Sequence, residues 1–279
     1  MRPRILITGA SGFLGSRLWR QAHKRNWDVS GTYFSKPPPG EKNAGLSRLD
    51  LKSDTQAADL VDRLRPEVVV HTAYSQSERE VIFQGTRRLA GACARLEDKP
   101  YFIFLSTDLV FDGGKGNYCE EDQARPVMGY GRDKLEAEAQ VRSLLPGSLV
   151  VRTSLLYDLI RVPSHLRFAL EAEAAGRSYT FFRDEYRSPM LVDELARALL
   201  ELAVIRPRGL LHVAGRDRVD RFLFGTALMK ALGYGVEHAV AGSFQERGLS
   251  RPPDCSLDSS RAGKLLGRQF SGAGEVLGG

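Results

Sequence analysis

The sequence of 279 residues has only three cysteines, Cys93, Cys119 and Cys255, and they lie far apart. Neither a disulfide framework nor the paired spacing of a zinc site can be built from them. The five histidines include no H-E-x-x-H pair, so we predict no metal centre. A G-x-S-x-G turn, the mark of many serine hydrolases, is also missing. The missing motifs argue against a zinc metalloprotease and against a serine hydrolase with a G-x-S-x-G turn. The lack of a disulfide framework favours a reducing compartment.

Long hydrophobic runs are missing as well. No segment approaches the roughly 18 apolar residues that cross a bilayer, and the N-terminus shows no signal-peptide pattern. The formal net charge is +6, from 40 basic and 34 acidic residues, but the basic residues are spread out. A nucleic-acid site would need a basic stripe or an aromatic platform. We therefore expect a cytoplasmic protein that binds a small molecule and neither nucleic acid nor membrane.

What the chain does contain is an alternation of short apolar runs with amphipathic stretches of helical length. This alternation predicts βαβ units, and hence an α/β fold with a doubly wound parallel sheet covered on both faces. Residues 1–152 should form the dinucleotide-binding core. Residues 153–279 should complete it at about 190–214 and otherwise form a smaller C-terminal substrate-binding lobe. The strands expected in the core are Ile5–Thr8, Val29–Tyr33, Val68–His71, Phe102–Ser106 and Leu149–Arg152, and the helices are Phe13–Lys24, Asp54–Leu64, Val81–Leu96 and Lys134–Leu144.

Three glycines, Gly9, Gly12 and Gly15, lie between the first expected strand and the first expected helix. Gly9 permits a tight turn, Gly12 lets backbone N–H groups approach a diphosphate, and Gly15 lets the helix pack close to the sheet. The spacing is one residue longer than the G-x-G-x-x-G fingerprint, but its position predicts a dinucleotide site. The other loop residues assigned to the cofactor are Ser11, Phe13 and Leu14.

The region after the second expected strand indicates which dinucleotide binds. An NAD protein usually has an acidic residue there, about 20 residues after the glycines, which holds the ribose 2′-hydroxyl. Here the residues are Tyr33, Phe34, Ser35 and Lys36, without an acid. Ser35 and Lys36 could receive a 2′-phosphate, so we predict NADP (NADPH) rather than NAD. Tyr33 should border the site of the 2′-phosphate. Asp50 and Leu51, which follow a further expected strand, should lie near the adenine.

Tyr130 and Lys134 have the Tyr-x-x-x-Lys spacing, which places both side chains on one face of a helix. A phenol with an ordinary pKa of about 10 exchanges protons poorly at neutral pH. A neighbouring ammonium stabilises the phenolate and lowers this pKa. Tyr130 could then protonate a carbonyl oxygen while hydride reaches the carbon. Thr107, directly after the expected strand Phe102–Ser106, could donate a hydrogen bond to the same oxygen.

Together these features resemble an extended short-chain dehydrogenase/reductase, and more narrowly the dTDP-4-dehydrorhamnose reductase family. The resemblance covers most of the chain, and its most specific piece runs from Ser106 to Gly113. Its further segments are Ile7–Gly15, Val70–Tyr74, Tyr118–Asp122, Tyr130–Glu138, Arg152–Tyr157, Asp184–Pro189 and Val192–Ala196.

This resemblance implies a Rossmann fold and NAD(P)H-dependent reduction of the C4 ketone of a nucleotide-linked deoxysugar. It implies that Thr107, Tyr130 and Lys134 are catalytic. It also implies that the residues after the fourth strand line the cofactor, namely His71, Thr72, Ala73 and Tyr74, and that Asp108, Leu155 and Arg187 lie at the substrate. Leu155 stands where the family usually has Trp, and Arg187 where Gly is common, so we expect an altered sugar site.

Two alternatives remain open. A nucleotide-sugar epimerase would use the same tyrosine and lysine with tightly held NAD, although such enzymes usually have longer chains. A non-catalytic, NADP-binding regulatory subunit would resemble the beta subunit of methionine adenosyltransferase. Such a subunit has no need of Thr107, Tyr130 and Lys134 together, which favours the enzyme. The fold family also makes a homodimer an expectation.

Overall fold

The structure is a computed structural model that describes residues 3–37 and 45–278. The chain forms two compact units. Unit 1 comprises Met1–Thr107, Gly129–Arg152 and Leu195–Leu211, and unit 2 comprises Asp108–Met128, Thr153–Glu194 and His212–Gly279. Residues 108–128, which the sequence analysis placed with the first part of the chain, thus group with unit 2. Among the described helices, none is long and apolar enough to cross a membrane.

Unit 1 is built on a seven-stranded sheet in the order β11-β6-β5-β4-β1-β2-β3. The pairs β1–β2, β1–β4, β2–β3 and β4–β5 are parallel. Leu6, Val69 and Phe102 in the central strands are completely buried, as expected for strands covered on both faces. The prediction of a doubly wound α/β fold is therefore confirmed. The strands are β1 Arg4–Thr8, β2 Asp28–Tyr33, β3 Leu46–Arg48, β4 Val68–His71, β5 Tyr101–Thr107, β6 Leu149–Thr153 and β11 Gly209–His212.

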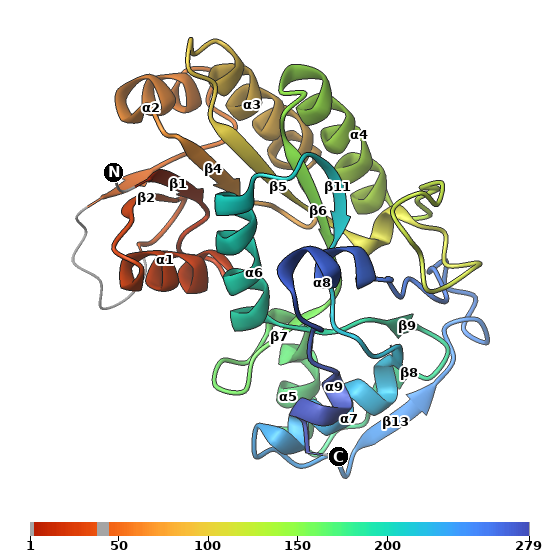
Figure 1. The fold of residues 1–279 in the computed structure, drawn as a ribbon. Helices are drawn as coiled ribbons and strands as arrows, with labels where there is room; N and C mark the ends of the chain where they lie inside the picture. The colour runs from red at the N-terminus through yellow and green to blue at the C-terminus, as the bar shows by residue number, and fades with distance from the viewer. Residues whose placement is uncertain (1–2, 38–44, 279) are drawn as a thin grey trace. The chain divides into compact units, whose positions relative to one another are not determined.

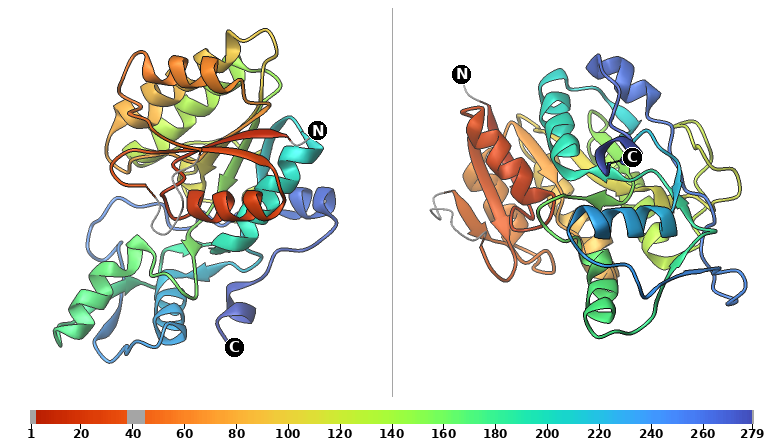
Figure 2. Two further views of the ribbon diagram at one scale, coloured as in Figure 1. Left: turned by 90° about the vertical axis from the view of Figure 1, so that its left-hand side faces the viewer. Right: turned by 90° about the horizontal axis from the view of Figure 1, so that it is seen from below.

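Helices cover both faces of this sheet. α2, α3 and α4 lie on one face, and α1 and α6 lie on the other (Figures 1 and 2). Each presents small or apolar residues to the strands, as Leu89, Ala90 and Cys93 of α3 do. α4 begins five residues earlier than predicted, so Tyr130 lies inside the helix. The bounds are α1 Gly15–Lys24, α2 Gln56–Leu64, α3 Thr86–Ala94, α4 Gly129–Leu144 and α6 Val192–Ile205.

A π-helical segment, η1 (Glu80–Gly85), precedes α3, where the sequence predicted one continuous helix. A Cβ atom on Gly85 would lie 2.7 Å from the Cβ of Leu51, so a glycine is needed for this close approach. At the next residue, the Thr86 hydroxyl donates to the carbonyl of Ile82 at 2.6 Å. π-helical turns are rare and occur frequently at functional sites. This one directs Thr86 toward the end of β4.

The buried ring of His71 connects this turn to β1. Its Nε2 lies 3.0 Å from Thr86 Oγ1, and its Nδ1 lies 2.6 Å from Thr8 Oγ1. Because Thr86 donates its own hydrogen to Ile82, its oxygen accepts one from Nε2. Nδ1 then accepts from the Thr8 hydroxyl, and the Thr8 oxygen accepts from the amide of Ala73 at 3.3 Å. The network assigns His71 as the neutral Nε2–H tautomer.

Unit 2 has its own core around α5 (Arg167–Ala174), α7 (Arg221–Ala231) and the parallel pair β8 (Tyr179–Phe182) and β13 (Ala239–Gly242). The rings of Tyr157 and Phe224 meet edge to face, with 5.5 Å between centroids. The remaining elements of this unit are η2 Asp108–Val110, β7 Leu156–Tyr157, η3 Ser164–Leu166, β9 Tyr186–Arg187, β10 Met190–Leu191, β12 Val219–Asp220, α8 Ser260–Leu266 and α9 Ala273–Val276.

The neutral His71 makes stability depend on pH. Burial and, to a smaller extent, the charge of Lys134 lower the pKa of His71 to about 3. Between pH 6.5 and 3 the unfolded chain therefore binds a proton that the folded chain rejects. The free energy of unfolding should fall as the pH falls through this window, by up to about 1.4 kcal/mol per pH unit.

We predict that His71→Gln flattens this dependence by about 1 kcal/mol per pH unit between pH 6 and 5. Urea unfolding at pH 5, 6 and 7.5 measures it, and above pH 7 the difference between the two proteins should become constant. The variant keeps some slope, because burial also lowers the pKa of His165 to about 3. Equal slopes in the two proteins would contradict the assignment of His71 as neutral in the folded protein.

Candidate active site

The glycine loop turns sharply from β1 into α1, and its glycines are required by contact. Gly9 has φ of +71°, and a Cβ atom there would lie 2.9 Å from the Cα of Ala73. A Cβ atom on Gly15 would lie 2.0 Å from the carbonyl oxygen of Gly9. Gly12 is exposed, and its amide donates to that same carbonyl at 2.8 Å. The loop is therefore a narrow turn whose backbone faces solvent at Gly12.

Thr32 at the end of β2 holds this loop in place. Its hydroxyl accepts from the amide of Gly9 at 3.2 Å, and its carbonyl accepts from the amide of Ala10 at 2.7 Å. In the described chain, no side chain caps the start of α1, where Leu14 is the N-cap, and its first turn contains no acidic residue. The first amides of a helix lack intrahelical partners and attract anions. The loop therefore fits a diphosphate group.

Three further residues of the loop were predicted to contact the cofactor. Ser11 and Phe13 are half-buried and Leu14 is buried.

The predicted ribose-phosphate end lies just beyond β2. Tyr33 ends this strand, and Ser35 and Lys36 are exposed. Arg48 at the end of β3 adds a second cation, because its Nε donates to the carbonyl of Phe34 at 3.2 Å. The sequence analysis did not single out Arg48, although its position one strand away from Tyr33 places it beside this loop.

The residues expected at the adenine follow β3. Leu51 is buried, and the Asp50 carboxylate accepts from the amide of Lys52 at 2.9 Å. At the exit of β4, Thr72 donates to the carbonyl of Thr8 at 2.7 Å, so the exits of β1 and β4 are bonded together. Tyr74, beyond them, is 53% exposed.

Tyr130 and Lys134 lie one turn apart at the start of α4, as their spacing predicts. The Lys134 ammonium donates to the carbonyl of Leu105 in β5 at 2.8 Å and lies 4.6 Å from the centroid of the Phe104 ring. Burial lowers the pKa of Lys134 to about 8, although the charge of Glu138 raises it. The Tyr130 ring is half-buried, with its centroid 6.4 Å from that of Tyr74. Thr107, at the end of β5, is 7% exposed.

Glu138 continues the same face of α4, one turn beyond Lys134. It is buried and accepts two hydrogen bonds from Arg152 of β6, at 3.0 and 2.7 Å. Its carboxylate also accepts from the hydroxyl of Ser106 in β5. Glu138 therefore holds α4 against β5 and β6. Its carboxylate also provides a buried negative charge near the Lys134 ammonium. The spacing of four residues could have predicted that Glu138 lies on the same helix face as Lys134. Nothing in the sequence predicts that it pairs with Arg152.

Unit 2 holds the residues predicted at the substrate. Asp108 is completely buried and forms an ion pair with Arg187, whose Nε donates to Oδ2 at 2.6 Å. Burial lowers the pKa of Arg187, but the charge of Asp108 outweighs this, so the pKa rises above its ordinary value. Ser154 also donates to Asp108. Leu155 is half-buried and packs on the core of unit 2. Much of the hydrogen-bonding capacity of Asp108 and Arg187 is thus used within the protein.

The described residues contain no group of three or more His, Cys, Asp or Glu side chains placed to hold a metal ion. The polar groups that organise unit 1 are instead hydroxyls, one histidine and the Glu138–Arg152 pair. Sequence analysis overlooked the hydroxyls of Thr8, Thr32 and Thr86, because single threonines at strand ends or helix starts give no distinctive pattern.

Similar proteins include a probable low-salt glycan biosynthesis reductase, Agl14, of Haloferax volcanii. It is 30% identical to this chain over 94% of the chain and 91% of the relative. The methionine adenosyltransferase 2 subunit beta of Danio rerio is 25% identical over 95% of this chain and 85% of its own length. A crystal structure of dTDP-4-dehydrorhamnose reductase from Bacillus anthracis, in complex with NADP, shares the fold with a TM-score of 0.82. It is 24% identical, with 99% of this chain and 98% of the other covered.

Residues 2–271, almost the whole chain, match the family described as RmlD substrate binding domain. The expected resemblance is confirmed over both units. This protein belongs to the family described as RmlD substrate binding domain, an extended short-chain dehydrogenase/reductase family that resembles the dTDP-4-dehydrorhamnose reductases.

Proposed function

We propose that this protein uses NADPH to reduce a ketone on a nucleotide-linked deoxysugar, with Tyr130 as the proton donor. The observation that carries the proposal is the buried Lys134 ammonium, fixed to β5 one helical turn from Tyr130. A positive charge held at this position stabilises a phenolate and so lowers the tyrosine pKa. Proton transfer to the substrate oxygen near neutral pH becomes feasible.

Each residue of the site has a distinct role in this proposal. Lys134 holds its charge beside the phenol and does not leave, because β5 accepts its hydrogen bond. Thr107 donates a hydrogen bond to the substrate oxygen and orients it toward Tyr130. The reduced nicotinamide, when bound, supplies the hydride. The glycine loop and the first turn of α1 would hold its diphosphate.

The choice of NADPH rests on the residues after β2. The described residues directly after Tyr33, Phe34–Pro37, include no acid that would hold a free 2′-hydroxyl, whereas Lys36 is exposed and Arg48 lies beside the same loop. A 2′-phosphate is a dianion at neutral pH, and these cations complement it.

A regulatory subunit is the second candidate, favoured by the similarity to methionine adenosyltransferase 2 subunit beta. It would bind the dinucleotide through the same loop without turnover. The similarity to the glycan biosynthesis reductase and the presence of Thr107, Tyr130 and Lys134 together favour the enzyme.

We predict that Tyr130→Phe lowers kcat about 10²- to 10⁴-fold, because the proton donor is lost. NADPH oxidation with dTDP-4-dehydrorhamnose and related 4-keto sugar nucleotides measures turnover, and NADPH fluorescence measures binding. The dissociation constant for NADPH should change less than threefold. Undiminished turnover in the variant would refute the mechanism, and no turnover of any sugar nucleotide by the wild type would favour the regulatory subunit.

The Lys134 pKa of about 8 predicts an alkaline limit on activity. Its ammonium predominates at pH 7 and is lost as the pH rises through 8, so kcat should fall above this value. Glu138→Gln removes the charge that raises the pKa of Lys134, so the fall should begin at lower pH. Because breaking a buried pair costs about 3–5 kcal/mol, circular dichroism must first show that the variant is folded. A limit that stays in place or moves to higher pH in this variant would contradict the role of Lys134.

Lys36→Glu should weaken NADPH binding at least tenfold, about 1.4 kcal/mol, and leave NADH binding almost unchanged. The introduced carboxylate repels the 2′-phosphate of NADPH, whereas it can accept a hydrogen bond from the 2′-hydroxyl of NADH. Fluorescence titration with both cofactors measures this. Lys24→Glu at the far end of α1 makes the same charge change away from the loop and serves as the control. Wild-type activity restricted to NADH would overturn the NADPH assignment.

A further inference from the structure

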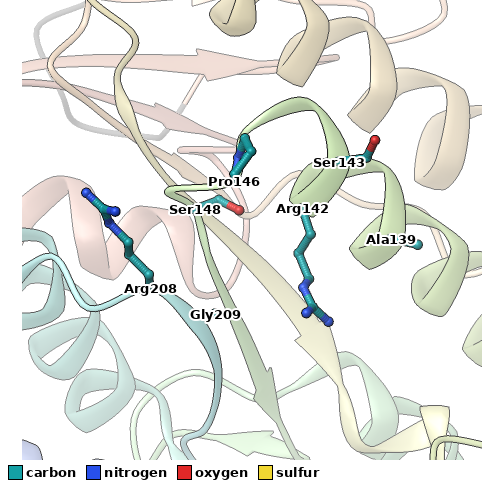
Figure 3. A pocket seen from close by; sticks show the side chains of 7 residues that line it. All are labelled: Ala139, Arg142, Ser143, Pro146, Ser148, Arg208 and Gly209. Atoms are coloured by element: carbon teal, nitrogen blue, oxygen red, sulfur yellow. The ribbon is translucent and has the colours of Figure 1, made fainter.

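A pocket of about 630 Å³ opens in unit 1 at the amino ends of two strands. It is lined by the last turns of α4, by the link from α4 to β6 and by the start of β11 (Figure 3). The glycine loop, Thr107 and Tyr130 lie at the carboxyl ends of the strands, which is the opposite edge of the sheet. The pocket is therefore separate from the candidate active site.

One buried polar atom in this pocket lacks a partner. Ser148 is 2% exposed, and its hydroxyl has no hydrogen bond within the described structure. Its backbone is satisfied, because its amide donates to Leu145 and its carbonyl accepts from Gly209, both at 2.9 Å. Buried polar groups are almost always hydrogen-bonded, so this hydroxyl at a pocket wall is available to a molecule bound in the pocket.

Two cations flank this hydroxyl. In the view of Figure 3 the Ser148 oxygen lies between the stems of Arg142 and Arg208, and both guanidinium groups extend outward, so they would have to turn inward to meet a ligand. Both arginines are exposed, and neither forms a hydrogen bond or an ion pair with any described residue. By contrast, Arg79 and Arg88 on the same unit each pair with two carboxylates. The residues that line the pocket include no acid, so its positive charge is uncompensated.

We propose that this pocket binds a phosphate-class oxyanion, with Ser148 donating to it and Arg142 and Arg208 closing on it from two sides. Guanidinium groups bind phosphate oxygens through paired hydrogen bonds. A tetrahedral oxyanion has acceptor oxygens in several directions and can serve three donors around it. A carboxylate offers its acceptor sites in one plane only. The size of the pocket admits a di-phosphate or a phosphorylated small molecule. This inference is independent of the proposed reductase activity.

Calorimetric titration of pyrophosphate into the full chain tests the proposal. The ionic strength is held constant, and titrations are run with and without saturating NADPH so that binding in the glycine loop is recognised. We expect one pyrophosphate site that persists with NADPH. The double variant Arg142→Gln/Arg208→Gln should weaken this site at least tenfold. Arg87→Gln, which removes an exposed and unpaired arginine of α3, is the matched control and should bind as the wild type does.

Ser148→Ala distinguishes a ligand site from a structural one. It should weaken pyrophosphate binding at least threefold without lowering the melting temperature of the free protein, because the hydroxyl has no partner to lose. Inorganic phosphate and AMP, titrated in the same way, separate a free ion from a phosphoryl group on a larger molecule, and binding of either at this pocket supports the proposal. No pyrophosphate binding by the wild type, or equal binding by the double variant, would overturn it.

Discussion

The burial of the Lys134 ammonium constrains the rest of unit 1. Removing a cation from water costs several kcal/mol unless hydrogen bonds and opposite charge offset the loss. The Leu105 carbonyl and the Phe104 ring face the ammonium, and Glu138 supplies the nearby carboxylate. Glu138 in turn binds Arg152, so the three groups carry one net positive charge. The surplus is available to a phenolate.

The dinucleotide end of the sheet depends on close backbone contact and on hydroxyls. Gly15 can pack against the carbonyl of Gly9, and Gly9 against Ala73, only because neither glycine has a side chain. Thr32 bonds the loop to β2, and the network of Thr8, His71 and Thr86 bonds β1 to β4 and to the π-helical turn. These hydrogen bonds are made within the protein and hold the backbone around the glycine loop without a ligand. Such preorganisation reduces the ordering cost of binding.

Much of this fold follows from periodicity in the sequence. Apolar runs marked the central strands within one or two residues, because strands covered on both faces must be apolar throughout. The Tyr-x-x-x-Lys spacing placed Tyr130 and Lys134 on one helix face. The helix over 81–96 was predicted without its π-helical turn, because this turn depends on contact between Gly85 and the distant Leu51. Pairs such as Glu138 with Arg152 arise only when separate elements meet, and no local pattern encodes them.

The ion pair of Asp108 and Arg187 has a consequence for substitutions at either position. The resemblance to the family led us to expect Gly where Arg187 stands, and in this protein the arginine neutralises a carboxylate that has no exposure to water. Losing the arginine alone would break this buried ion pair and leave the carboxylate charge uncompensated by Arg187, at a cost of about 3–5 kcal/mol. Position 187 is therefore coupled energetically to position 108, and a replacement of Arg187 costs least when Asp108 is replaced with it.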